Sequence, residues 1–506
     1  MKKKSTISII LCLARLLSAA PVYACTGVYV GREVSAEGTT LIARSEDQGS
    51  NIVNKLFYVQ KAVNQSGREM VDTGLYQHGF SVPLPDKTYK YTYLQDDPYS
   101  NDGLYYACCT NECGLAVVGT VTTSVSTEYR WLDPLQYEGH GLREAILPAL
   151  ICCQAASAEE AVHVYAELLD KYGSEEYNTL LFSDRNEAWI FENYGGHTYA
   201  AMRLPEDKVA VFGNQIMIGW VDLDETDGYV FAPGLKACLE KLRDPVIDEQ
   251  GRYHLAMSID PGKRSAFSNL RTWRGHQLLA PSTAGEYSDE TFYPLLFEPD
   301  KKVSVIDIME LYGDRLEGTE FDKNLPGNES RRAIGVPNQG NVHIIQTFSE
   351  LPDCTCQLQW LAMGNAEHAM FVPAFSGITD TYEKYQLVDT ETRKVTDSFY
   401  YQTKLVCGLA ESDRKYLGQG VKDYNVRQEK AMLERILEEI PVIQQKYKWF
   451  QFIGNNYVTK LGKEMAAEAY EDIQNLYDHL AYIQIQNNGD VTDNNEKVHF
   501  KMPKDN

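Results

Sequence analysis

The segment from residue 25 to residue 44 constrains the fold most strongly, because it predicts a β-hairpin that begins with a reactive side chain. Its two arms, "CTGVYV" (25–30) and "TTLIAR" (39–44), are rich in β-branched and aromatic residues, and the segment between them begins and ends with glycine. If Val30 pairs with Thr39, the same register places Cys25 opposite Arg44. Opposed residues share one face of a sheet, with Cβ atoms about 5 Å apart. The hairpin therefore predicts a thiol beside a guanidinium.

A secretory leader precedes this hairpin. Lysines at positions 2–4 and an apolar run over 5–20 have the order of a signal peptide, and the run is too short to span a bilayer comfortably. Val22 and Ala24 supply the small side chains that a signal peptidase accepts at the third and first positions before its cut. We therefore expect export, with a mature chain that begins at Cys25 and is secreted or held in a bacterial cell envelope.

A cysteine at a mature N-terminus carries both groups of a nucleophilic catalyst. Its thiol can attack a carbonyl, and its α-amine, with an ordinary pKa of about 7.7 to 8.0, can accept and return the proton. Arg44 is expected to favour the thiolate by lowering a thiol pKa that is otherwise about 8.5. Asp47 could reach the α-amine or Arg44. None of the ten histidines falls in a metal-ligand or Ser/His/Asp signature, and this chemistry needs no histidine.

The opening "CTGVYVGREVSAEGTTLIARSED" resembles that of the dipeptidases of the dipeptidase A type. Those enzymes open with Cys-Thr, carry a Gly-Thr or Gly-Ser strand, and end the next strand with Ala-Arg-x-Glu-Asp. Four later segments resemble the family in the same order: "NECGLAVVGT" (111–120), "GLREAILPALICCQAASAEEAV" (141–162), "EAWIFENYGGHTYAAMRLPEDKVAVFGNQ" (187–215) and "MFVPAFSGITDTYEKY" (370–385). The family lies within the N-terminal-nucleophile hydrolases, together with choloylglycine hydrolase and penicillin V acylase. The resemblance implies an α+β fold, a four-layer αββα sandwich, and a cysteine dipeptidase that requires no cofactor or metal.

Residue by residue, the resemblance implies that Cys25 is the nucleophile and that Arg44 and Asp47 are its neighbours. Asn214 in "VAVFGNQ" is similar to the asparagine that the related amidases place at the oxyanion. A side-chain amide donor at such a position is worth about 3 to 4 kcal/mol.

Two further features of the related enzymes are less well matched. Arg271 is the candidate for the second arginine of the amidases, with Arg274 as the alternative. Their second asparagine has no clear counterpart, since this part of the chain offers only Thr120 and its neighbours. The chain also departs from the usual Arg-Asp-His before "EGT" (317–319), a loss that we expect to alter substrate fit.

The charge balance argues against nucleic acid and anionic membrane as partners. The 506 residues carry a net charge of −23, which becomes −27 once the leader and its four basic residues are removed, leaving 44 basic against 71 acidic residues. Such a surface repels polyanions. We expect a dipeptide or short peptide as the partner, and no membrane association after processing.

Ten cysteines remain after the leader is removed. Adjacent cysteines, as at 108–109 and 152–153, rarely bond to each other, and "CTC" at 354–356 lacks the second half of a zinc site. The pair at 152–153 falls in a helical run, where buried structural thiols are expected.

The chain is expected to contain a signal peptide (1–24), a peptidase domain (25–424) and a C-terminal helical extension with a polar tail (425–506). Helical periodicity over 141–173 is interrupted near "AAS", where Ser157 can cap a second helix. Further elements are predicted as a hairpin over 187–204, a helix over 303–316, strands at 341–348, 356–363 and 369–375, and helices over 427–440, ended by Pro441, and 459–486.

Two other functions stay open beside the dipeptidase. The same chemistry could act on an N-acyl amide such as a conjugated bile acid or a penicillin. Alternatively, lipid on Cys25 would give a lipid-anchored binding protein with an inactive site, although Tyr23 fits poorly the small residues usual before such a cysteine.

Overall fold

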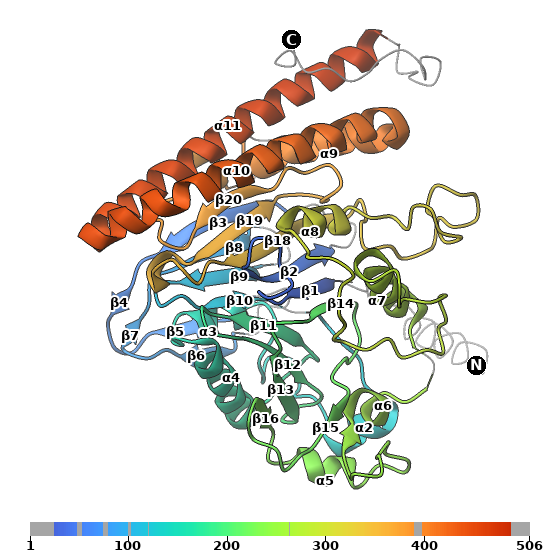
Figure 1. Cartoon of the computed structure of the whole chain (residues 1–506). Helices are drawn as coiled ribbons and strands as arrows, with labels where there is room; N and C mark the ends of the chain where they lie inside the picture. Colours follow the sequence, from blue (N-terminus) through green and yellow to red (C-terminus); the bar gives the residue numbers. More distant parts are fainter. Residues whose placement is uncertain are drawn as a thin grey trace, which may run out of the picture.

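The computed structural model describes residues 25–47, 53–73, 79–99, 103–119, 121–262, 264–388 and 397–486. The predicted leader, Thr120 and the polar tail from residue 487 lie outside the described residues. Two large antiparallel sheets lie face to face, and helices cover the outer face of each (Figure 1).

The first sheet contains the strand that follows Cys25 in its interior, with the strand order β14-β1-β2-β18-β19-β20. Its strands are β1 (Thr26–Val30), β2 (Thr40–Asp47), β14 (Val209–Phe212), β18 (Gln339–Thr347), β19 (Gln357–Ala362) and β20 (Val372–Phe375). Each neighbouring pair is antiparallel. Because β1 lies between β14 and β2, residues at the ends of both neighbours come close to Cys25.

The second sheet has the order β16-β13-β12-β11-β10-β9-β8-β3. Its strands are β3 (Lys55–Gln60), β8 (Tyr91–Asp96), β9 (Tyr106–Asn111), β10 (Ala116–Val118), β11 (Thr179–Ser183), β12 (Ala188–Asn193), β13 (Tyr199–Leu204) and β16 (Tyr229–Phe231). The hairpin predicted over 187–204 is confirmed as β12 and β13. Strand β2 packs against β10 and β11, so the main core lies between the two sheets.

Two helices predicted from one interrupted periodic run cover the second sheet. They are α3 (Leu147–Cys152), which packs on β9 and β10, and α4 (Ala158–Tyr172), which packs on β11 and β12. The Ser157 side chain accepts the Glu160 N–H at 3.1 Å, which confirms the predicted cap. The thiols of Cys152 and Cys153 are buried, as expected, and no disulfide forms among the described cysteines.

The other helical layer lies on the first sheet. It consists of α7 (Ala266–Leu279) against β14, α8 (Val305–Tyr312) against β18, and the group α9 (Phe399–Ser412), η3 (Arg414–Gly418), α10 (Gln419–Trp449) and α11 (Gln451–Gln486), of which α10 and α11 contact β20. Figure 1 shows α9, α10 and α11 on the side of the sheets opposite α4. The four-layer αββα arrangement and the α+β class are therefore confirmed.

Shorter elements complete the described chain. They are α2 (Thr127–Leu132), α5 (Leu235–Leu239), α6 (Leu255–Ile259), η1 (Asp353–Thr355), η2 (Glu383–Tyr385), and the strand pairs β4 (Val63–Asn64) with β7 (Lys87–Thr88), β5 (Glu69–Val71) with β6 (Ser81–Pro83), and β15 (Trp220–Val221) with β17 (Tyr253–His254). None of the helices that the structure describes combines the length and apolarity needed to cross a membrane.

The hairpin predicted over residues 25–44 forms, but its register is shifted by two residues. Val30 pairs with Leu41 rather than Thr39, and Arg44 lies across from Gly27. Thr39 is drawn into the turn, where its N–H and hydroxyl contact the Ser35 hydroxyl. Because side chains alternate with a period of two along a strand, this shift keeps every residue on its predicted face.

The predicted helix end at Pro441 is wrong. Helix α10 continues through Pro441 to Trp449 and packs along α11. A proline removes one helical hydrogen bond, that of the carbonyl four residues earlier, at Leu437. Leu437 is an exposed residue, so water can donate a hydrogen bond to this carbonyl. Packing against α11 stabilises the remaining turns of α10. The expected boundary at 424/425 also lies inside α10, and the division into domains stays a prediction.

Candidate active site

The site forms around Cys25, immediately before β1 and almost fully buried at 2% exposure. Strand β2 supplies Arg44 and Asp47, the loop after β14 supplies Asn214, and helix α7, which packs on β14, supplies Arg271. The structure thus brings all five predicted residues into one region. Their separation along the chain means that only the antiparallel order of β14, β1 and β2 assembles them.

The thiol of Cys25 is bound by Arg44. The guanidinium Nη2 donates to Sγ at 3.1 Å and to the hydroxyl of Tyr105 at 2.7 Å. Although the predicted direct pairing of Cys25 with Arg44 is wrong, the long arginine side chain spans the diagonal on the shared face. Tyr105 was not predicted, because it lies just before β9 in the other sheet.

Burial raises the pKa of the Cys25 thiol, and this effect exceeds the lowering by Arg44. The carboxylates of Asp47 and Glu144 raise the pKa further. The expected net lowering of the thiol pKa is therefore wrong, although the direction predicted for the arginine alone is correct. A resting thiol in this environment is protonated and requires a base before it can attack.

The backbone nitrogen of Cys25 donates to Oδ1 of Asn214 at 2.9 Å. Arg271 Nη2 also donates to this oxygen, at 2.8 Å, and Asn214 Nδ2 donates to the carbonyl of Thr122 at 2.8 Å. These partners are compatible with only one orientation of the amide. Asn214 thus holds the nitrogen that becomes the α-amine when Cys25 is the first residue, while one of its two amide hydrogens is engaged by Thr122.

Arg271 is fully buried and binds the backbone carbonyl of Cys25. Its Nη1 donates to the Cys25 carbonyl and, at 2.9 Å, to the hydroxyl of Thr26. Burial and the nearby charge of Arg332 lower the pKa of the Arg271 guanidinium to about 9, which leaves it charged at neutral pH. The alternative candidate, Arg274, instead binds Asp314 at 2.8 and 2.6 Å.

Asp47 has a different partner from those expected. Its carboxylate is bound by Arg332, rather than by Arg44 or the nitrogen of Cys25. Burial raises the pKa of Asp47, against the opposing effects of Arg332, Arg271 and Arg44. Its Oδ1 is buried without a hydrogen-bond partner among the described residues. The doublet "RR" at 331–332 was a visible but weak signal for this contact.

The region around Thr120 is the one expected to hold a counterpart of the second asparagine of the related amidases. Thr120 lies outside the described residues, and its neighbour Thr122 meets Asn214 through a carbonyl, which accepts a hydrogen bond and cannot stabilise an oxyanion.

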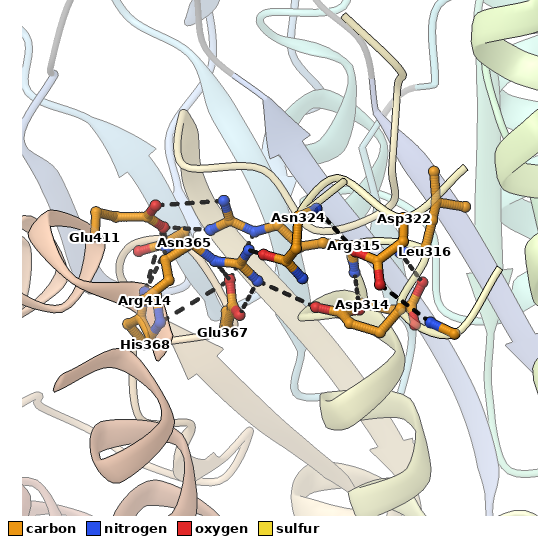
Figure 2. A network of polar contacts seen from close by, with 12 residues as sticks. Asp314, Arg315, Leu316, Asp322, Asn324, Asn365, Glu367, His368, Glu411 and Arg414 are labelled. Carbon is orange, nitrogen blue, oxygen red and sulfur yellow. Dashed lines mark hydrogen bonds and ion pairs between the residues drawn. The ribbon is translucent and has the colours of Figure 1, made fainter. Parts of the chain in front are cut away.

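Among the described residues, Glu367, His368 and Glu411 form one group with ligand atoms close enough to hold a metal ion. Figure 2 shows that the carboxylates of Glu367 and Glu411 form ion pairs with arginine side chains. Arg315 binds Glu367 at 2.6 Å and also binds Glu411, and Arg414 binds Glu367 at 2.5 Å. Two positive charges thus balance the two carboxylates, so we interpret the group as an ion-pair network that joins α9 and η3 to the segment before "EGT".

A family profile described as peptidase family C69 matches residues 24–427, which is most of the chain. A protein named probable dipeptidase B from Streptococcus pyogenes serotype M6 is 29% identical over 439 residues, covering 84% of this chain and 86% of that protein. One named dipeptidase A from Lactobacillus helveticus is 27% identical over 405 residues, covering 78% and 83%.

A solved structure of a mutant conjugated bile acid hydrolase from Clostridium perfringens aligns with a TM-score of 0.30 at 13% identity, covering 69% of this chain and 92% of that one.

Proposed function

This chain belongs to peptidase family C69 and is a peptidase, and we propose that it is an exported cysteine dipeptidase whose nucleophile is the thiol of an N-terminal Cys25. One observation carries the proposal: the sulfur, nitrogen and carbonyl oxygen of this single residue are each bound by a different buried or partly buried side chain, namely Arg44, Asn214 and Arg271. Buried backbone N–H and carbonyl groups are bonded in any residue, so the distinguishing contact is that of the sulfur, which a cysteine that only filled space in the core would not need. The relatives named dipeptidases favour dipeptides as substrates.

In the proposed reaction, the α-amine of Cys25 takes the thiol proton as the sulfur attacks the carbonyl carbon of the peptide bond. The raised thiol pKa makes this base necessary, and Arg44 stabilises the negative charge on sulfur. The remaining amide hydrogen of Asn214 donates to the developing oxyanion. The amine then returns the proton to the leaving nitrogen, which departs as the C-terminal amino acid.

The thioester that remains is hydrolysed by water. The α-amine accepts a proton from the water as its oxygen attacks, and the same oxyanion donor stabilises the second intermediate. Collapse of this intermediate breaks the carbon–sulfur bond and releases the N-terminal amino acid, and the proton returns to the thiolate. No group other than water is consumed.

Removal of the leader is part of the proposal, because a residue before Cys25 would convert the amine into an amide that cannot accept a proton at neutral pH. General-base assistance is worth about 10² to 10⁴-fold. A chain kept unprocessed, for example by Ala24→Pro, should lose about that much dipeptidase activity with its fold intact. Cleavage at a protease site placed before Cys25 should restore the activity.

The test measures hydrolysis of a dipeptide panel beside glycine-conjugated bile salts and penicillin V, using secreted protein whose N-terminus is verified by mass. Turnover of dipeptides supports the proposal, whereas turnover of the acyl amides alone contradicts it. An unprocessed chain that works as fast as the trimmed one contradicts the role of the α-amine. A diacylglycerol mass on Cys25 would instead identify a lipid anchor.

A further inference from the structure

One charged residue beside the site, Glu144, has no part in the proposed reaction. Its Oε2 accepts a hydrogen bond from the hydroxyl of Thr122 at 3.2 Å. The carbonyl of the same threonine accepts from Asn214, which binds the Cys25 nitrogen. Thr122 therefore contacts both the amide beside the nucleophile and the carboxylate of Glu144.

A second set of contacts leads from the thiol to the same residue. Arg44 bridges the Cys25 sulfur and the hydroxyl of Tyr105. The next residue, Tyr106, donates its N–H to the carbonyl of Ala145 at 2.9 Å. Ala145, the chain neighbour of Glu144, thus lies beside the start of β9, next to the tyrosine that binds Arg44. The two sets of contacts close a ring that contains Cys25 and Glu144.

The charges around Glu144 are predominantly negative. Its N–H donates to Glu176 at 2.8 Å, and Arg143 lies 3.5 Å from Glu176 and 3.7 Å from Asp72. The three carboxylates of Glu144, Glu176 and Asp72 thus outnumber two guanidinium groups, that of Arg143 and that of Arg44, whose pKa the charge of Glu144 helps to raise. Burial and the nearby charge of Glu144 raise the pKa of Glu176 to about 7. A cation brought next to Glu144 would reduce this negative excess.

Several polar atoms in the ring and directly beside it have no hydrogen-bond partner among the described residues. Within the part of the chain that the structure describes, Nε and Nη1 of Arg44 and the hydroxyl of Thr123 are buried and make no hydrogen bond. Arg44 is 1% exposed and Thr123 is 8% exposed. Buried polar atoms are normally satisfied, so these atoms indicate that water or a polar ligand occupies the region. The nitrogens of Arg44 can donate only to an oxygen, whereas the hydroxyl of Thr123 can accept a hydrogen bond from an ammonium group. Glu144 itself is half-buried, which keeps its carboxylate reachable.

We propose, as an extension of the dipeptidase function proposed above, that the carboxylate of Glu144 binds the α-ammonium group of the substrate. In a dipeptide the α-nitrogen lies about 2.5 Å from the carbonyl carbon under attack. If Asn214 holds the carbonyl oxygen, the ammonium falls beside Thr122, whose hydroxyl already contacts Glu144. This contact selects peptides cut after their first residue, a property that dipeptidases share with aminopeptidases.

The test compares two substrates that differ only in the amine, alanyl-alanine and propanoyl-alanine. Wild-type enzyme should show a kcat/KM about 10 to 150-fold lower for propanoyl-alanine, the range expected for one charged hydrogen bond. Glu144→Gln should lower kcat/KM for alanyl-alanine by a similar factor and change that for propanoyl-alanine less than about threefold. Glu144→Asp keeps the charge and should retain a preference for the free amine.

Glu175→Gln is the matched control. Glu175 lies in the same acidic region, and its Oε1 accepts the N–H groups of His140 and Gly141 at 2.9 Å, contacts that a glutamine oxygen can keep. This variant should leave the ratio of the two substrates unchanged.

The proposal is overturned if Glu144→Gln slows both substrates equally, which would place its effect on the nucleophile, or if it leaves the preference for the amine intact. In both cases the dipeptidase function stands. If wild-type enzyme hydrolyses neither substrate nor any other dipeptide, the dipeptidase function fails as well. Should Glu144→Gln not fold, Glu144→Asp decides the question, because its carboxylate keeps the charge on a side chain shorter by one methylene. A weaker but persisting preference for the amine supports the proposal, and a preference equal to that of wild type contradicts it.

Discussion

Replacing Arg44 with glutamine tests the electrostatics of the nucleophile most directly. The guanidinium donates to the Cys25 sulfur at 3.1 Å, and both residues are almost fully buried. Unit charges about 4 Å apart interact by about 4 kcal/mol at an effective dielectric constant of about 20. Since 1.36 kcal/mol corresponds to one pKa unit, the thiol pKa should rise by roughly 2 to 3 units. The direction is upward because the guanidinium stabilises only the thiolate.

The assay is the pH dependence of alkylation by iodoacetamide, measured by mass on the peptide that contains Cys25. Peptide resolution is required, because the described chain contains ten free cysteines. Only the thiolate reacts, so at a fixed pH below the pKa the rate should fall about 100 to 1,000-fold in Arg44→Gln. Arg44→Lys keeps the charge but loses the planar fork that reaches both the sulfur and Tyr105, so its pKa should rise less.

A profile for Arg44→Gln within about half a pKa unit of wild type, in a protein with unchanged thermal stability, would refute this reasoning. It would mean that the arginine binds Tyr105 without acting on the thiol. If Arg44→Gln does not fold, Arg44→Lys decides the question, since an unchanged profile in that variant contradicts the contact as well.

Further variants at three positions test other parts of the structure. Cys25→Ala should reduce dipeptide turnover to below about a thousandth with little change in Tm, whereas Cys25→Ser should retain slow turnover, because a serine is a weaker nucleophile at its free pKa. Asn214→Ala should lower kcat by about 10² to 10³-fold, and a loss below tenfold would exclude it as an oxyanion donor. Glu429 is buried in α10, where burial raises its pKa to about 8. A carboxyl group whose pKa is raised in the folded state destabilises the protein as the pH rises above the unfolded pKa of about 4.3. The gain in the free energy of unfolding caused by Glu429→Gln should therefore grow from pH 4 to pH 8, to at most about 5 kcal/mol. An equal gain at both pH values would contradict the raised pKa.

The sequence by itself determined the features that depend on short stretches of chain. The hairpin arms around residues 25–44, the Ser157 cap and the hairpin over 187–204 follow from local composition and hydrogen bonding. Cys25 and Arg44 share a face even though the predicted register was wrong, because a two-residue shift preserves the alternation of a strand. The family resemblance supplied Asn214 and Arg271, which no local pattern would have selected.

The tertiary structure decided everything that depends on what packs against these stretches. Helix α10 passes through Pro441 because α11 supports it, against the local propensity. The direction of the Cys25 pKa follows from burial, which the sequence does not state, and it outweighs the arginine that the sequence does reveal.

The partners of the predicted residues were also decided by packing. The pairing of Asp47 with Arg332 and the approach of Glu144 to the thiol join residues more than a hundred positions apart. The sequence shows which charged groups a chain contains. The partner of each group and its exposure to water are determined only when distant strands and loops pack together.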